Sequence, residues 1–256
     1  MKQTQKNQFT AMMMAWGTYL ALPCPCKRWD DSLRPWQIVY LPLMGLLVGA
    51  AWALCAGVFA HLGFTGLLAA AILTLVPFFL TGFFHFDGFL DCCDAIFSRR
   101  ALAVRQQILK DSRVGTFAVV GAIVLFLLSF ASLATCTLSQ VWRALLLIPV
   151  SSRCMAGVAV QTFAPMQTSQ YAGSFCAGKN RRQRSCLLAV YVAVMLLDFV
   201  WLFSRPACAL SVAWTALTTI LACRYARREL GGMSGDIAGF AITVGELSGL
   251  LILAIF

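Results

Sequence analysis

Apolar stretches of about 20 residues, the length that crosses a bilayer as an α-helix, recur along the whole chain. Short polar segments separate them. The stretches occupy residues 41–60, 64–84, 116–135, 141–162, 186–203, 207–223 and 237–256. The pattern therefore predicts an all-α fold, a polytopic integral membrane helical bundle of about seven transmembrane helices.

Residues 1–22 are less apolar than these stretches, and Pro23 and Pro25 follow them. This segment lacks the charged start, apolar core and cleavage site of a signal peptide, so we expect a retained interfacial or re-entrant helix. No Pro-, Ser- or Gly-rich linker divides the chain, and residues 1–256 are expected to form a single domain. With 60% hydrophobic residues and a mean hydropathy of +0.80, too little polar surface remains for a soluble helical protein.

The basic residues indicate how the bundle is oriented. If the N-terminus is cytoplasmic, the cytoplasmic segments are 1–40, 85–115, 163–185 and 224–236, which hold 17 of the 20 Lys and Arg. This asymmetry predicts a multi-pass protein of a bacterial inner membrane with its N-terminus in the cytoplasm and its C-terminus outside. The net charge of +10 comes with no nucleic-acid recognition module, so anionic lipid headgroups or a phosphorylated substrate are the expected partners.

Small residues in the apolar stretches indicate helix contacts rather than chemistry. The eleven cysteines include no CxxC pair, so we expect reduced thiols, with a metal site at Cys24 and Cys26 as an open alternative. Glycines spaced four residues apart predict close helix approach. These pairs are Gly45 and Gly49, Gly235 and Gly239, and Gly245 and Gly249.

Three of the ten acidic residues stand together directly after the second apolar stretch, at Asp87, Asp91 and Asp94. On a helix, positions i, i+4 and i+7 lie within roughly 60° of one another, so the three carboxylates share a face. Such clustering beside a membrane is unfavourable unless a cation lies between the charges, and a divalent ion with oxygen ligands is the simplest candidate.

Two further polar segments are expected to accompany this cluster at the cytoplasmic side. One carries Asp111 and Arg113. In the other, Gly232, Ser234 and Gly235 precede Asp236 at the start of the last apolar stretch. Backbone N–H groups at a helix N-terminus bind phosphate, and the acid there suggests a metal ion that bridges to it.

A few polar residues lie within or beside the apolar stretches. Arg153 and Glu246 are at matched depths, about 14–15 Å along their helices, which predicts an ion pair or a shared polar cavity, with helix packing alone as the alternative. Asp198 is expected to be structural, paired with Arg143 or Arg205. His85 is either a hydrogen-bonded interfacial side chain or a group that orients a carboxylate, acts as general base or binds substrate.

An acidic cluster, basic loops and a Gly-rich turn together suit Mg²⁺-assisted chemistry on a phosphate or diphosphate. A CDP-alcohol phosphatidyltransferase is disfavoured because no Ala-Arg follows Asp87 and Gly88. An aromatic prenyltransferase is weakened because Asp236 has no partner acid four residues away. A transporter or channel would use the intramembrane charges but leaves the acidic cluster unexplained.

The segment from His85 to Asp94 resembles the HxDGxxDxxDG signature of the cobalamin synthase family, the adenosylcobinamide-GDP ribazoletransferases. The resemblance continues in 108–117, similar to that family's KDxRxGxxG, in 231–236, similar to its GGxTGD, and in 22–25, similar to its LPxP. Ala95, Ala118 and Ser234 replace two glycines and a threonine of the family pattern, but no acid and no histidine is lost.

This resemblance implies that adenosylcobinamide-GDP reacts with α-ribazole, or its 5′-phosphate, to give adenosylcobalamin, or its 5′-phosphate, and GMP. It implies Mg²⁺ held by Asp87, Asp91 and Asp94, with Asp236 as a further ligand. His85 is the candidate base, and Arg113 is the leading candidate to bind the diphosphate. Asp111 completes the metal site or orients Arg113. The remaining substrate-binding candidates are Gly232, Ser234, Gly235, Arg153 and Glu246. A homo-oligomer is left open.

Overall fold

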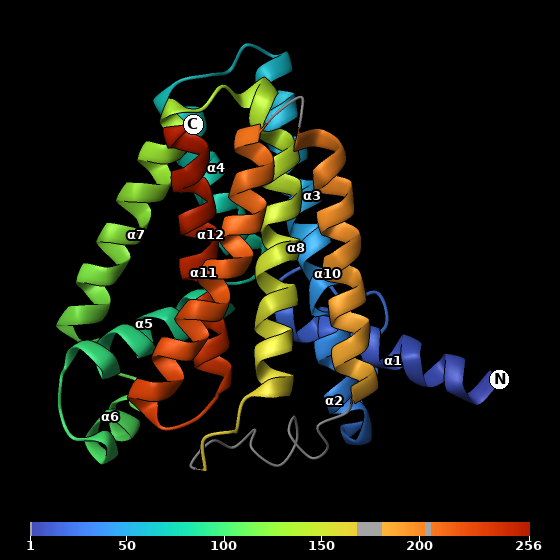
Figure 1. Cartoon of the computed structure of the whole chain (residues 1–256), viewed down its shortest axis with the longest axis vertical. Coiled ribbons are helices and arrows are strands. Elements are labelled where there is room, and N and C mark those ends of the chain that lie inside the picture. Colours follow the sequence, from blue (N-terminus) through green and yellow to red (C-terminus); the bar gives the residue numbers. More distant parts are fainter. Residues whose placement is uncertain (1, 168–180, 203–205) are drawn as a thin grey trace.

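The structure, a computed structural model, describes residues 2–167, 181–202 and 206–256 and is almost entirely helical there (Figure 1). Within these ranges, six helical segments are long and apolar enough to cross a membrane, or seven if the bent pair α4 and α5 counts as one span. The polytopic helical bundle predicted from the apolar stretches is confirmed. The long helices are α3 (Leu41–His61), α7 (Thr116–Thr135), α8 (Leu138–Thr162), α10 (Arg181–Leu202), α11 (Pro206–Leu230) and α12 (Gly235–Ile255).

The second apolar stretch does not run straight to residue 84 as its pattern suggests. Helix α4 (Leu67–Leu80) is only 14 residues long, and α5 (Phe84–Phe97) bends away from it by 94°. Gly82 and Phe83 have φ values of +58° and +61°, and this left-handed backbone ends a helix. The prediction was wrong here because the apolar run itself continues through the bend. The acidic segment consequently lies on a helix that crosses the bundle (Figure 1).

Helix α8 is the centre of the bundle and packs against α3, α10, α11 and α12. Gly45 and Gly49 of α3 face the carbonyl groups of Pro149 and Leu146 on α8, and a Cβ atom at either glycine would overlap those oxygens. Gly245 and Gly249 face hydroxyl groups on α11 in the same way. These glycine pairs therefore make the close contacts that their spacing predicts. Gly235 differs, since no atom lies within 4 Å of its Cβ position.

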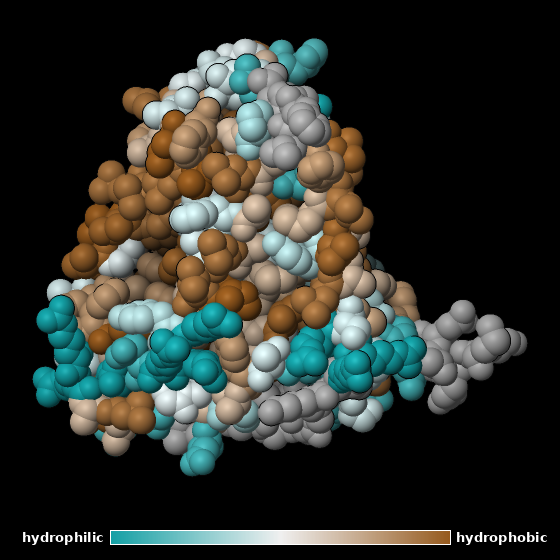
Figure 2. Space-filling view, viewed as in Figure 1, coloured by the Kyte–Doolittle hydropathy of each residue, from teal (hydrophilic) through white to brown (hydrophobic). Residues whose placement is uncertain are grey.

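The N-terminal segment forms helix α1 (Lys2–Tyr19), as the sequence predicts, and it ends ahead of Pro23. The C-terminal end of α1 packs on α3, where Ala15 and Tyr19 join a buried cluster with Leu41 and Met44. The chain then reaches α3 through η1 (Asp31–Leu33), α2 (Arg34–Gln37) and η2 (Ile38–Tyr40). The apolar surface of the long helices gives way to a hydrophilic belt at the end of the molecule where α1, α2 and α6 lie (Figures 1 and 2).

Short helix α6 (Leu102–Ile108) belongs to this hydrophilic end and is attached to the last turn of α11. Arg105 forms an ion pair with Glu229, and the Gln106 amide donates to the carbonyl oxygen of Leu230 at 2.8 Å. These contacts hold the segment between α5 and α7 beside the Gly-rich turn. All ten cysteines in the described residues are free thiols.

The α3–α8 contact generates a stability prediction. We expect Gly49→Ala to cost about 1–3 kcal/mol of unfolding free energy, because the methyl group meets backbone that cannot move aside without separating the helices. The measurement is a denaturant titration of the purified protein in detergent. Gly57→Ala on the same helix is the matched control, since nothing lies within 4 Å of that Cβ position. Equal midpoints for both variants would contradict the packing described.

Candidate functional site

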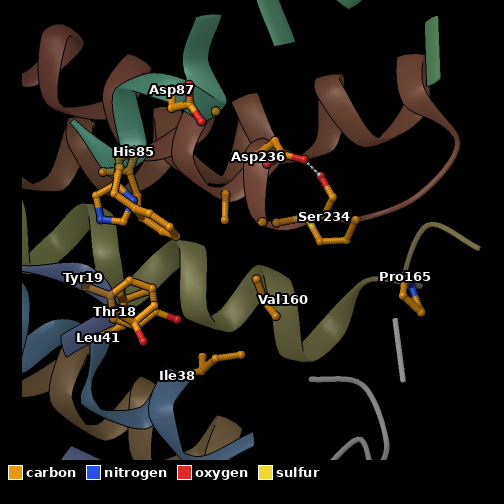
Figure 3. A pocket seen from close by; sticks show the side chains of 16 residues that line it. Thr18, Tyr19, Ile38, Leu41, His85, Asp87, Val160, Pro165, Ser234 and Asp236 are labelled. Carbon is orange, nitrogen blue, oxygen red and sulfur yellow. Dashed lines mark hydrogen bonds between the residues drawn. The ribbon is translucent and has the colours of Figure 1, made fainter. Parts of the chain in front are cut away.

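A pocket of about 280 Å³ opens between α5, the start of α12, the end of α8 and the segment from α1 to α3 (Figure 3). One wall is polar and includes His85, Asp87, Ser234 and Asp236. The opposite wall is mostly apolar. Its residues include Thr18, Tyr19, Ile38, Leu41 and Val160. A concave site with a few polar groups facing an apolar surface is typical of small-molecule binding.

The polar wall exists because α5 and α12 cross at very short range. A Cβ atom on Gly88 would lie 2.8 Å from the Cα and carbonyl oxygen of Asp236, and one on Gly239 would lie 2.8 Å from the carbonyl oxygen of His85. Both distances are too short for any side chain, so only glycine allows this crossing. The crossing brings the acidic segment of α5 next to Asp236, as the sequence motifs suggested.

The carboxylates at this crossing have no basic partner in the part of the chain that the structure describes. Within the described residues, Asp87, Asp91 and Asp236 form no ion pair with any Lys or Arg. Like charges at close range in a partly buried site repel one another strongly. Among the residues that the structure describes, no group of three or more His, Cys, Asp and Glu side chains is arranged to hold a metal ion. The magnesium site stays a prediction, and the all-oxygen donors at the crossing are of the type that Mg²⁺ takes.

Asp94 has a role that the sequence did not indicate. Its Oδ2 accepts a hydrogen bond from Gly115 N at 2.6 Å, and its Oδ1 accepts one from Ala118 N at 2.9 Å. The carboxylate therefore caps the N-terminus of α7, where free backbone N–H groups and the helix dipole favour an anion. The side chain is buried, and it fixes the end of the 98–115 segment against α5.

Asp111 and Arg113 form an exposed pair on that segment, and neither lines the pocket. The Asp111 carboxylate accepts from Arg113 Nε at 3.0 Å and from Arg113 Nη2 at 2.7 Å. Hydrogen bonds from the Arg113 side chain and backbone lower the pKa of Asp111 to about 2. Of the two roles open for Asp111, orientation of Arg113 is the one that this geometry supports.

His85 lies at the junction of the polar and apolar walls. Its ring stacks on Tyr19 with centroids 6.1 Å apart and contacts Phe84 edge-on at 5.4 Å. The side chain is 6% exposed, and its Nε2 atom has no hydrogen-bond partner. A buried ring nitrogen without a partner is costly to maintain and is typical of a site that a ligand completes.

The Gly-rich turn is held by backbone pairing with the segment that follows α8. Met233 N donates to Ala164 O at 2.8 Å, and Met166 N donates to Met233 O at 2.9 Å. A Cβ atom on Gly232 would meet Met166 N at 2.5 Å, so glycine is required for this approach. Ser234 caps α12 by accepting from Ile237 N and also donates to Asp236, both at 3.3 Å. Both side chains border the pocket (Figure 3).

Arg153 and Glu246 form the predicted ion pair inside the bundle. Arg153 Nη1 donates to Glu246 Oε1 at 2.5 Å and to Pro149 O at 3.1 Å, and Ser152 Oγ donates to the same Glu246 oxygen at 2.9 Å. Neither charged residue lines the pocket. Their predicted contact with substrate is untested.

Asp198 was predicted to pair with Arg143 or Arg205. The structure shows a buried Asp198 side chain whose Oδ1 has no partner among the described residues. Arg205 lies outside the described residues.

Sequence reasoning missed most of the apolar wall. Thr18, Ile38 and Val160 are separated by long distances in the chain, and no motif marks them. Only Tyr19 gave a signal, as an aromatic residue at the end of a less apolar segment. Side chains that line a pocket and side chains that fill a core have the same composition in a membrane helix, so the pattern could not separate them.

Comparison with known proteins identifies the family of the chain. The family described as cobalamin-5-phosphate synthase matches residues 11–254. A Clostridium perfringens protein named adenosylcobinamide-GDP ribazoletransferase is 34% identical over 248 residues, 96% of this chain and 98% of the relative. Relatives with the same name from Clostridium botulinum and Lachnoclostridium phytofermentans are 31% and 29% identical and cover 98% and 93% of this chain, and 99% and 90% of their own lengths. No solved structure matches.

Asp94, which caps α7, and Asp91, which has no basic partner within the described residues, are expected to contribute differently to the free energy of unfolding. Asp94→Ala should lower the unfolding free energy by about 0.5–2 kcal/mol, because the α7 N-terminus loses its cap. Asp91→Asn should leave stability unchanged or slightly higher, because it relieves repulsion among unpaired carboxylates. Denaturant titration in detergent measures both. Equal destabilisation by the two variants would show that Asp94 is not the cap described.

Proposed function

The chain belongs to the cobalamin-5-phosphate synthase family, and we propose that it joins adenosylcobinamide-GDP to α-ribazole, or its 5′-phosphate, with release of GMP. The observation that carries this proposal is the α5–α12 crossing, which brings the His85–Asp94 and Gly231–Asp236 motifs to one pocket. The curated relatives that carry this activity in their names align over nearly the full chain. The products are adenosylcobalamin, or its 5′-phosphate, and GMP.

The reaction is a phosphoryl-group displacement. The ribazole hydroxyl oxygen attacks the cobinamide-side phosphorus, a new P–O bond forms, and the bond from that phosphorus to the diphosphate bridging oxygen breaks. GMP leaves with the electrons of that bond. Nε2 of His85, buried and without a protein partner, takes the proton of the attacking hydroxyl.

The carboxylates at the α5–α12 crossing would bind the metal ion, a role separate from the proton transfer by His85. Asp87, Asp91 and Asp236 would hold Mg²⁺, which, when bound, neutralises the charge of the diphosphate. These side chains offer oxygen atoms and form no ion pair within the described residues. Asp94 stays outside this ligand set because its two oxygens accept the α7 backbone N–H groups.

Substrate phosphates would be bound on the Gly-rich side. Ser234 and Gly235 border the pocket at the N-terminus of α12, where the helix dipole attracts an anion. Gly232 keeps that turn close to α8. The side chain of Arg113 is 88% exposed. Asp111 accepts hydrogen bonds from its Nε and Nη2 atoms and would orient the guanidinium, whose remaining N–H groups can bind a diphosphate.

We also place the pocket at the cytoplasmic face of a bacterial inner membrane, with the N-terminus inside. Basic residues concentrate on the segments that precede α3, that join α5 to α7 and that end α11. These segments belong to the hydrophilic end of the molecule (Figure 2), and positively charged loops stay on the cytoplasmic side.

The activity can be tested directly with purified protein, adenosylcobinamide-GDP, α-ribazole and Mg²⁺, by measuring GMP release. We expect metal-dependent GMP release from the wild type and a loss of at least about 100-fold for Asp91→Asn, because phosphoryl transfer depends on electrostatic stabilisation. The control is Asp30→Asn, a change at an exposed carboxylate of the N-terminal segment, which should retain activity. Well-folded protein that releases no GMP would reject the proposed function.

Metal binding has its own readout, separate from turnover. Mn²⁺ in place of Mg²⁺ is expected to bind the protein with a diphosphate nucleotide present, and its free signal in electron paramagnetic resonance should fall. The double variant Asp87→Asn/Asp236→Asn should lose at least about tenfold in Mn²⁺ affinity, because two charged ligands are removed. Unchanged affinity in that variant would place the metal elsewhere.

A further inference from the structure

A second cavity lies inside the bundle, apart from the pocket. It has a volume of about 20 Å³ and is bounded by α3, α4, α7 and α12. Its polar lining residues are Trp52, Thr74, Ser129, Thr243 and Glu246. Polar groups from four helices around so small a space inside a bundle of apolar helices need an explanation.

Trp52 provides an unpaired donor at this cavity. Its side chain is 1% exposed, and its indole Nε1–H has no hydrogen-bond partner. A buried N–H group without an acceptor costs about 1–3 kcal/mol, and Trp usually finds a partner when it is buried. A Phe at this position would fill nearly the same space without that cost.

Glu246 provides an acceptor at the same cavity. Its Oε1 atom accepts from Arg153 and Ser152, and no residue that the structure describes donates a hydrogen bond to its Oε2 atom. The side chain is 14% exposed, and it borders the cavity. Thr243 and Ser129, which have no recorded hydrogen bond of their own, add hydroxyl groups that can donate or accept.

We propose that this cavity is a binding site for one water molecule, which accepts from Trp52 Nε1–H and donates to Glu246 Oε2. Its second hydrogen is directed to a hydroxyl oxygen of Ser129 or Thr243. A cavity needs at least roughly 10–15 Å³ and two to four polar partners to hold a water, and this site meets both conditions. No other change in the structure is required.

A metal cation fits this site less well, although most of its polar atoms are oxygens. The indole N–H directs a positive hydrogen into the space, and a cation there would be repelled by it. The charge of Glu246 is already balanced by Arg153, so no net negative charge remains to offset the cost of dehydrating an ion. A neutral molecule that both accepts and donates satisfies all these groups at once.

The water has a structural consequence. It links α3 to α12 and completes the hydrogen bonds of Glu246, whose other oxygen holds Arg153 on α8. Three helices are then joined by one buried polar network at a level where the surroundings are apolar. Helix α12 carries Asp236 at its N-terminus, so the network also sets the position of the helix that supplies one wall of the pocket.

Ultraviolet resonance Raman spectroscopy of the full-length protein tests this site, because one indole band reports the hydrogen bonding of N–H. The chain has seven Trp residues, and the wild-type spectrum minus that of Trp52→Phe isolates Trp52. We expect the Trp52 band at the position of an indole whose N–H donates a hydrogen bond. Trp214→Phe is the matched control. This Trp is 41% exposed on α11, a helix apolar enough to cross the membrane, and lipid or detergent tails offer its N–H no acceptor, so its difference spectrum should show a free indole.

A pair of substitutions at Ser129 separates a water from a direct contact. Ser129→Ala keeps the space, and the Trp52 band should stay in its hydrogen-bonded position. Ser129→Val places methyl groups in the cavity, and the band should shift to the free position as the water is displaced. Retained hydrogen bonding in Ser129→Val would overturn the proposal in favour of a direct bond, and a band that moves with Na⁺ concentration would overturn it in favour of a cation. A free Trp52 indole, obtained as the difference between wild type and folded Trp52→Phe, would reject it whatever the Ser129 variants show.

Discussion

The close crossing of α5 and α12 is the contact on which the site depends. Gly88 meets the backbone of Asp236, and Gly239 meets the backbone of His85, so two helices approach to a distance that no side chain would permit. Packing along the rest of both helices offsets the repulsion between the carboxylates at the crossing. The close approach of these carboxylates therefore lowers the free energy of unfolding of the protein. A cation that binds together with a phosphorylated ligand would relieve that repulsion. The α5–α12 crossing therefore indicates where such ligands bind.

Other features maintain the crossing. The left-handed residues Gly82 and Phe83 turn α5 across the bundle, and Asp94 attaches its far end to α7. Helix α6 forms an ion pair and a hydrogen bond with the end of α11 beside the Gly-rich turn, and that turn is paired with the segment that follows α8. The pocket therefore rests on contacts from most of the bundle. A change well away from the carboxylates can alter their spacing through any of these attachments.

The sequence predicted the features that depend on composition and periodicity. Apolar stretches located the long helices, and the matched depths of Arg153 and Glu246 predicted their ion pair. The bend after α4 was missed because the apolar run passes through it without a polar break. The capping role of Asp94 was missed because it depends on a contact with Gly115, which no local pattern reveals. The apolar wall of the pocket could not be predicted, since residues such as Ile38 and Val160 are indistinguishable from core residues until the helices are packed.

The most direct test of the central claim is the rate of GMP release by Gly88→Ala, a variant that changes no charged or polar group. A methyl group at this position forces α5 away from Asp236, and a displacement of about 1 Å at a reacting centre costs on the order of 100-fold in rate. The account predicts a loss of that size in protein whose helical content and unfolding midpoint show that it is folded. A folded Gly88→Ala protein that releases GMP at the wild-type rate would contradict it.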